Sequence, residues 1–169
     1  MSTPELIALF HHRWAPPALA LLHARGGARF VELQRKLGVG RESLQRALEA
    51  LTELGFIRRN PGYGHPLRPE YVLTPAGRQP GGIAEEVLAA GDNELLLRKW
   101  SVPVIAELGD GKRFSELRAA LPGVTPRALA LALRELEQGA LVNRTVLDTR
   151  PPSTLYRPTG AALRIAAVL

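Results

Sequence analysis

Residues 113–139 read RFSELRAALPGVTPRALALALRELEQG and contain the pattern from which the fold can be predicted. Residues 114–121 keep apolar side chains three and four positions apart, which predicts a helix with one buried face. Pro122-Gly123 breaks that helix, and Thr125-Pro126 is typical of an N-cap followed by the first helical residue. A second helix is predicted over residues 126–138. Two helices joined by so short a turn indicate a helix-turn-helix unit.

The same pattern occurs twice in the chain. Anchor residues recur in the same order at offsets of 84 to 86 residues: Trp14 and Trp100, Phe30 and Phe114, Leu44 and Leu129, Leu48 and Leu133, Leu51 and Leu136, and Tyr71 and Tyr156. A match of this kind is the signature of an internal duplication. In each copy, a short apolar segment with proline at its start, Pro17 to Ala24 or Pro103 to Leu108, predicts a further helix before these two helices. Each copy therefore predicts the same unit of three helices, and the third helix of the first copy is predicted from Arg41 to Leu54.

Each copy continues past its third helix into a predicted β-hairpin. In the first copy, strand-like residues 56–59 and 70–73 flank a segment rich in turn formers, and residues 141–144 and 154–157 repeat this arrangement. Three helices followed by a hairpin form a winged helix-turn-helix. The fold class expected is mainly α with small β-hairpin wings (α+β), arranged as two tandem winged helix-turn-helix domains.

The predicted domains span residues 1–82 and 83–169. The linker between them is predicted at Gln79-Pro80-Gly81-Gly82, because proline and paired glycines commonly mark a connection between folded segments.

A family resemblance rests on the second copy. Its residues that carry the resemblance are Lys99-Trp100, Arg113-Phe114-Ser115-Glu116-Leu117, Leu121-Pro122-Gly123-Val124-Thr125-Pro126-Arg127, Leu133-Arg134-Glu135-Leu136-Glu137 and Pro151-Pro152 before Tyr156. This pattern strongly resembles the HxlR family of bacterial transcription regulators, and residues 12–78 resemble it more loosely. The resemblance implies a DNA-binding regulator that normally has one such domain per chain and dimerises through flanking helices. With two domains in one chain, both a homodimer and an intrachain pseudo-dimer stay open.

Composition narrows the function classes. The 169 residues carry a formal charge of +6, which favours an anionic partner. Nucleic acid is the first candidate for this partner, and an anionic membrane surface is the second. The absence of cysteine excludes disulfides, thiolate chemistry and thiol redox sensing. The four histidines show no metal-ligand spacing, and no set of potential catalytic residues recurs in the copies, so we expect no metal, no cofactor and no enzyme. Without an apolar run of about 18 residues or a signal peptide, we expect no membrane association and a cytoplasmic, nucleoid location.

The third helix of each copy is the expected reader of DNA, because such a helix presents side chains to base edges in the major groove. Helical geometry turns Glu42, Gln45, Arg46 and Glu49 away from the core in the first copy. Arg127, Ala130, Leu131 and Arg134 are the outward residues of the second. The candidate DNA-binding residues, including those of the two wings, are Arg41, Ser43, Gln45, Arg46, Arg58, Arg59, His65, Arg68, Arg127, Arg134, Arg144 and Arg150.

The charge is unequal between the predicted halves. Residues 1–82 hold 11 basic and 6 acidic side chains, a net charge of +5, and residues 83–169 hold 11 and 10, a net charge of +1. We therefore expect the first domain to make the stronger DNA contacts. An alternative for its arginines is a solvated face with intrahelical ion pairs to Glu42, Glu49 and Glu53.

The principal hypothesis is a DNA-binding transcription regulator whose partner is double-stranded DNA. One alternative is a tandem winged-helix module that binds another protein, similar in layout to the chromosome-segregation protein ScpB. The apolar residues Ala130 and Leu131 on the outward face of the second copy favour this alternative. Another is a non-specific nucleoid-associated protein, which would bind specific and random duplexes equally well.

Overall fold

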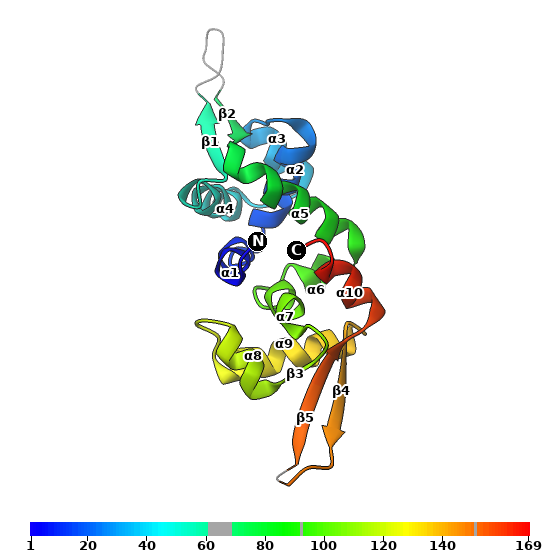
Figure 1. The fold of residues 1–169 in the computed structure, drawn as a ribbon. Helices are drawn as coiled ribbons and strands as arrows, with labels where there is room; N and C mark the ends of the chain where they lie inside the picture. Colours follow the sequence, from blue (N-terminus) through cyan, green and yellow to red (C-terminus); the bar gives the residue numbers. More distant parts are fainter. Residues whose placement is uncertain (61–68, 92, 151) are drawn as a thin grey trace. The chain divides into compact units, whose positions relative to one another are not determined.

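The computed structural model describes residues 1–60, 69–91, 93–150 and 152–169. The chain divides into two compact units, of which the first comprises residues 11–89. The second comprises residues 90–169 together with residues 1–10. Each unit contains a helix-turn-helix followed by a β-hairpin (Figure 1).

The first unit is built from a helical trio, a hairpin and an exit helix. Its elements are α2 (Ala15–Arg25), α3 (Phe30–Leu37), α4 (Arg41–Glu53), β1 (Ile57–Asn60), β2 (Glu70–Leu73), the 3-10 turn η1 (Pro75–Gly77) and α5 (Arg78–Ala90). Strands β1 and β2 pair antiparallel, with Arg59 opposite Tyr71. Ala28 pairs with Tyr71 in a single antiparallel bridge and so lies beside β2 in this small sheet.

The second unit repeats this plan. Its elements are α1 (Thr3–Leu9), α6 (Asn93–Leu96), α7 (Ser101–Leu108), β3 (Lys112–Arg113), α8 (Phe114–Ala120), α9 (Pro126–Gln138), β4 (Val142–Leu147), β5 (Ser153–Pro158) and α10 (Gly160–Ala166). The sheet order is β3-β5-β4, and both pairings are antiparallel. Strand β3 takes the place of the Ala28 bridge in the first unit. The expected fold class, helical with small hairpin wings, is confirmed in both units.

The third helix of each unit is held by one stripe of leucines. Leu44, Leu48 and Leu51 of α4 are at most 2% exposed, and so are their counterparts in α9, Leu129, Leu133 and Leu136. The observed α4 ends at Glu53 with Leu54 as its C-cap, one residue short of the prediction, and α9 spans the predicted residues 126–138. Burying one stripe fixes which side chains of the helix face outward.

A threonine closes each wing onto the end of its third helix. Thr74 Oγ1 donates to the Gly55 carbonyl at 2.5 Å and accepts from the Gly77 amide at 3.1 Å. Thr159 repeats both bonds, donating to the carbonyl of Ala140 and accepting from the amide of Ala162. The hairpin and the exit helix are therefore tied to the third helix by one side chain in each unit.

The predicted linker at residues 79–82 is wrong, because these residues lie inside α5. Pro80 falls in the first turn of that helix, where the missing N–H costs no hydrogen bond. Gly81 lies against α2: a Cβ placed on it would be 2.9 Å from the Cβ of His23. His23 Nδ1 is also 2.8 Å from Glu85 Oε2. Gly81 thus permits close packing between α5 and α2.

The predicted boundary at residue 82 differs from the observed units, and residues 1–10 belong to the second unit. Leu6, Leu9 and Phe10 are at most 1% exposed, and α1 contacts α7. The N-terminal helix therefore completes the core of the unit farther along the chain. Sequence order alone assigns α1 to the first domain. Only its tertiary packing shows that α1 belongs to the second unit.

Glu107 of α7 anchors α1 by polar contacts. Its carboxylate accepts hydrogen bonds from the Thr3 hydroxyl and, at 2.8 Å, from the Lys112 ammonium. Burial raises the pKa of Glu107, but the hydrogen bonds from Lys112 and Thr3 and the Lys112 charge outweigh it, and the net pKa is lowered. A lowered folded-state pKa means that this contact stabilises the unit at neutral pH and weakens as pH falls through the pKa of the carboxyl group.

Replacing Leu9 by alanine tests the assignment of α1. We expect Leu9→Ala to destabilise the second unit by about 2–5 kcal/mol, because a fully buried leucine is removed. Hydrogen exchange should lose protection in α7 and keep it in α2. Leu163→Ala is the matched control: Leu163 lies in the same unit but is 52% exposed, so its loss should change stability by less than about 0.5 kcal/mol. Equal loss of protection in α2 and α7 would contradict the assignment.

Candidate nucleic-acid interface

The outward face of α4 carries the candidate readers of the first unit. Arg41, Ser43, Gln45 and Arg46 are all exposed, and the helix begins after a turn in which Gly38 has φ +61°. Glycine adopts that backbone conformation without strain, because it has no Cβ. Val39 is buried in the same turn. The turn therefore fixes where α4 starts and so which residues lie in its first two turns.

Two of these side chains are held by carboxylates of the same helix. Gln45 Nε2 donates to Glu49 Oε1 at 2.9 Å, and Arg46 Nη2 donates to Glu42 Oε1 at 2.5 Å. This is the ion-pairing arrangement that the sequence left as an alternative for Arg46. The side chains of Arg46 and Glu42 are 61% and 81% exposed, and pairs at such exposure contribute only about 0.2–1 kcal/mol. The bonds orient Gln45 and Arg46 without preventing their transfer to another partner.

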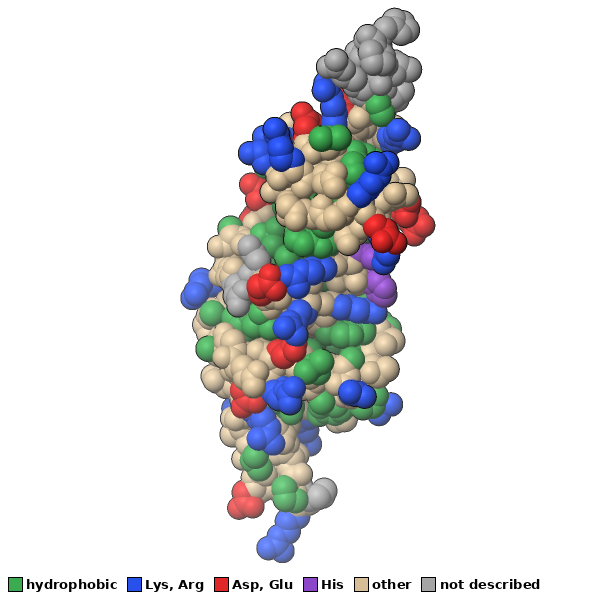
Figure 2. All heavy atoms as spheres, turned by 180° about the vertical axis from the view of Figure 1, so that it is seen from behind, with side chains coloured by type: hydrophobic (Ala, Val, Ile, Leu, Met, Phe, Trp, Pro, Cys, Tyr) green, Lys and Arg blue, Asp and Glu red, His purple; other side chains and the backbone are tan. Residues whose placement is uncertain are grey.

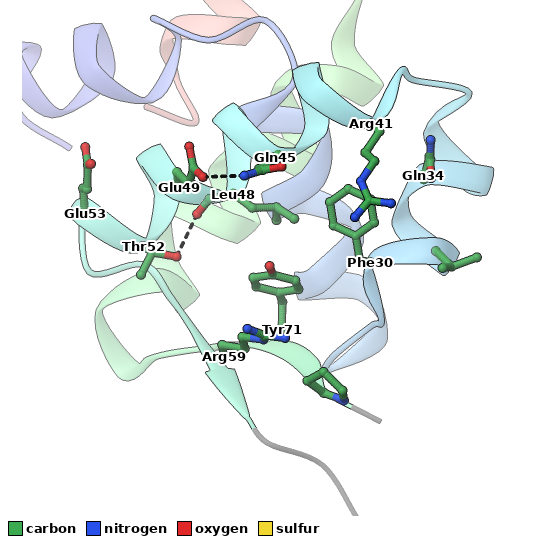
Figure 3. A pocket seen from close by; sticks show the side chains of 12 residues that line it. Phe30, Gln34, Arg41, Gln45, Leu48, Glu49, Thr52, Glu53, Arg59 and Tyr71 are labelled. Atoms are coloured by element: carbon green, nitrogen blue, oxygen red, sulfur yellow. Dashed lines mark hydrogen bonds between the residues drawn. The ribbon is translucent and has the colours of Figure 1, made fainter. Parts of the chain in front are cut away.

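A groove of about 800 Å³ lies between α3, α4 and the hairpin of the first unit. Its lining includes the ring of Tyr71 beneath Leu48, and Arg41 lying over the ring of Phe30 (Figure 3). The Arg41 guanidinium carbon is 5.8 Å from the Phe30 ring centroid, within the range of a cation–π contact. Sequence reasoning missed this partner, because the two residues lie on different helices and no local spacing connects them.

The wing of the first unit adds exposed arginines beside the groove. Arg58 and Arg59 are exposed on β1, where they pair with Val72 and Tyr71 of β2. The candidates His65 and Arg68 lie outside the described residues. The structure thus brings Arg59 to the same groove as Arg41 and Gln45.

The second unit presents a different helix face in the same place. Arg127, Ala130, Leu131 and Arg134 of α9 are exposed, with Leu131 at 43%. The neighbouring acid Glu135 turns away from these residues. Its side chain is 18% exposed and pairs with Arg98.

The wing of the second unit is the hairpin of β4 and β5. Arg144 is exposed on β4 opposite Tyr156, and Arg150 is exposed in the turn that follows β4. Figure 2 shows basic side chains along this hairpin. Arg144 and Arg150 therefore lie on one projecting element.

The net positive charge of the first domain led us to expect strong DNA contacts there, but its third helix, α4, is not itself basic. This helix carries two arginines and three glutamates, RESLQRALEALTE, so its own charge is −1. The basic excess of the first unit lies in the flanking segments, where Arg29, Arg35, Lys36, Arg58 and Arg59 are exposed. The cations available to an anionic partner are therefore concentrated in these flanks rather than in the third helix.

Two other kinds of functional feature bear on the class of protein. No group of three or more histidine, aspartate or glutamate side chains that could hold a metal ion is found among the described residues. No helix in the described ranges is long and apolar enough to cross a bilayer.

A helix-turn-helix with an attached hairpin, present twice, defines a tandem winged helix-turn-helix protein. The family described as HxlR-like helix-turn-helix matches residues 9–96 and again residues 95–169. The chain belongs to this family and contains two copies of its domain, as the resemblance of the second copy implied.

Similar proteins are HTH-type transcriptional regulators. An uncharacterised regulator from Synechocystis is 40% identical over 77 residues, which are 45% of this chain and 57% of that protein. YodB of Bacillus subtilis is 37% identical over 75 residues, 44% of this chain and 67% of its own length. The solved structure of reduced YodB has a TM-score of 0.41 and 36% identity, covering 44% of this chain and 74% of that one. The chain thus spans little more than half the length of the Synechocystis relative.

The N-cap of α9 positions Arg127 and can be tested directly. Thr125 Oγ1 accepts a hydrogen bond from the Ala128 amide at 3.2 Å. We expect Thr125→Ala to destabilise α9 by about 1 kcal/mol, because an amide at the helix start loses its acceptor. Hydrogen exchange of the α9 amides measures this. Thr52→Ala in α4 is the control, since Thr52 is exposed within a helix, where alanine is the better helix former; faster exchange in both variants would contradict the capping role.

Proposed function

We propose that this protein binds double-stranded DNA and regulates transcription. The observation that supports this is the duplicated helix-turn-helix with an exposed, arginine-bearing third helix in each unit and exposed arginines on each hairpin. Family membership supports the same function. In this proposal α4 and α9 enter the major groove and the hairpins contact the flanking backbone, as in other winged helices.

The proposed contacts separate into two groups by their chemistry. Base edges are read from α4 by Arg41, Ser43, Gln45 and Arg46, and from α9 by Arg127 and Arg134. Phosphates are held by the wing residues Arg58, Arg59, His65 and Arg68 of the first domain and Arg144 and Arg150 of the second. Phosphate contacts supply affinity without sequence information, and base contacts supply specificity.

We further propose that the first domain contributes more of the affinity. Residues 11–89 contain 11 basic and 7 acidic side chains, a net charge of +4, and five of the basic residues, Arg29, Arg35, Lys36, Arg58 and Arg59, lie in the segments that flank α4. Each phosphate neutralised lowers the logarithm of affinity by about 0.9 per tenfold rise in salt. The larger share of the salt dependence should therefore come from α3 and the first wing.

No catalytic step, cofactor or metal enters this proposal. The protein works on chromosomal DNA, hence in the cytoplasm at the nucleoid. One chain supplies two readers, either as an intrachain pseudo-dimer or within a homodimer, and the mass of the DNA complex by light scattering distinguishes these states.

The two groups of residues predict different changes in binding. Arg58→Ala with Arg59→Ala should lower the slope of log affinity against log salt by about 2, with the sequence preference kept, because two cations that hold phosphates are removed. Replacement of Arg41, Gln45 and Arg46 by alanine should reduce the preference for the specific duplex, by about 1–3 kcal/mol for each bidentate pair with a base that is abolished. Fluorescence anisotropy with specific and random duplexes measures both quantities.

Matched controls remove charge away from the proposed interface. Arg25 and Arg78 are exposed on α2 and α5, so Arg25→Ala with Arg78→Ala should leave both the salt slope and the sequence preference unchanged. Unchanged affinity and specificity in the α4 variant would refute α4 as a reader. Equal affinity for specific and random duplexes in the unaltered protein would identify a non-specific nucleoid protein. Absence of duplex binding with a stable protein partner would favour an interaction module of the ScpB kind.

A further inference from the structure

The two third helices can be compared position by position, because they begin at equivalent residues. Helix α4 spans residues 41–53 and α9 spans residues 126–138, so every residue of α4 has a counterpart 85 positions later. The leucine stripes coincide in sequence and in burial. The outward positions therefore correspond as well, and their differences are differences in what each helix can read.

Among the positions that are exposed in both helices, four form the outward face predicted from the sequence, and all four carry unlike side chains. In α4 they are Glu42, Gln45, Arg46 and Glu49, and in α9 they are Arg127, Ala130, Leu131 and Arg134. The first and last positions have opposite charge in the two helices. The two middle positions change from hydrogen-bonding side chains to apolar ones. The two copies therefore keep the same leucine core and differ at all four of these outward positions.

The chemistry of the α4 set matches polar base edges. An amide such as Gln45 pairs with adenine, a guanidinium such as Arg46 pairs with guanine, and a carboxylate such as Glu42 accepts from the amino group of cytosine. The bonds from Gln45 to Glu49 and from Arg46 to Glu42 hold the amide and the guanidinium in defined orientations before any DNA is bound. Less side-chain entropy is then lost on binding.

The α9 set can make fewer hydrogen bonds. Ala130 and Leu131 have no polar side-chain atoms, so on a base edge they would touch the methyl group of thymine. Arg127 and Arg134 lie on either side of them along the helix and can reach guanine edges or phosphates. This helix therefore favours a half-site with thymine at its centre.

We propose that one chain recognises a non-palindromic DNA site made of two unlike half-sites. The half-site of the first domain contains adenine and G·C pairs read by hydrogen bonds, and that of the second contains thymines read through their methyl groups. A symmetric dimer imposes its two-fold axis on its operator. Two unlike readers joined in one chain impose no such symmetry. This inference rests on the proposed function, since it concerns the sequence of the DNA bound.

Selection of randomised duplexes by the full chain, followed by sequencing, tests the proposal. We expect an enriched motif whose halves are related by neither an inverted nor a direct repeat. A transplant variant then carries Glu42→Arg, Gln45→Ala, Arg46→Leu and Glu49→Arg, which gives α4 the side chains of α9 at these four positions and leaves Arg41 and Ser43 in place. In its selected motif, the first half should change toward the second at the bases read from these four positions, and the bases read by Arg41 and Ser43 should stay the same. Affinity for the original site should fall about 5- to 150-fold for each bidentate hydrogen-bonded pair with a base that the substitutions abolish.

The reciprocal variant carries Arg127→Glu, Ala130→Gln, Leu131→Arg and Arg134→Glu and should convert the second half-site instead. All eight positions are exposed, so both variants should keep the hydrogen-exchange protection of their leucine stripes. Two like halves selected by the unaltered protein would overturn the inference while leaving DNA binding intact. A motif with one half only would also overturn it, because a single helix would then be reading. No enrichment of any duplex would overturn the proposed function together with it.

Discussion

The burial of one leucine stripe on each third helix is the constraint on which the rest of the structure depends. Leu44, Leu48 and Leu51 in α4, and their counterparts in α9, are almost completely removed from solvent. Replacing such a leucine by alanine would cost about 2–5 kcal/mol, a large part of the stability of a small domain. The stripe therefore fixes the rotation of the helix about its axis. Since the opposite face is exposed in both units, its residues are free to differ without cost to the core.

Features with a local cause could be predicted from the sequence. The limits of α9 follow from Thr125, Pro126 and the leucine spacing, all of which act within one or two turns, and the hairpins follow from clusters of turn formers. The duplication strengthened these predictions, because each pattern could be read twice. Gln45, Arg46, Arg127 and Arg134 were predicted to face outward, and all four are exposed. Their role in binding DNA stays a prediction.

Features with a tertiary cause could not be predicted. Residues 79–82 have the composition of a linker. Gly81, however, packs closely against His23, which is distant in sequence. Helix α1 precedes the first domain but completes the core of the second unit, and nothing in residues 3–9 identifies which apolar surface they cover. The contact of Arg41 with Phe30 likewise joins two helices across a turn. In each case the contacting residue lies farther away in the sequence than the few neighbouring residues over which helical periodicity and capping act.

If both domains bind DNA as proposed, joining them in one chain lowers the affinity that each domain needs on its own. Once one domain is bound, a second domain on the same chain meets nearby DNA at an effective concentration that reaches the millimolar range for short connections. A helix with few hydrogen-bonding groups, such as α9 with Ala130 and Leu131 at its centre, can then contribute even when its own affinity is only millimolar, provided that both readers reach one duplex. Two identical chains that assemble as a dimer share one sequence and so cannot divide affinity and discrimination in this way. In the proposed function, the duplication lets the basic flanks around α4 supply phosphate contacts, while the outward face of α9 can change independently.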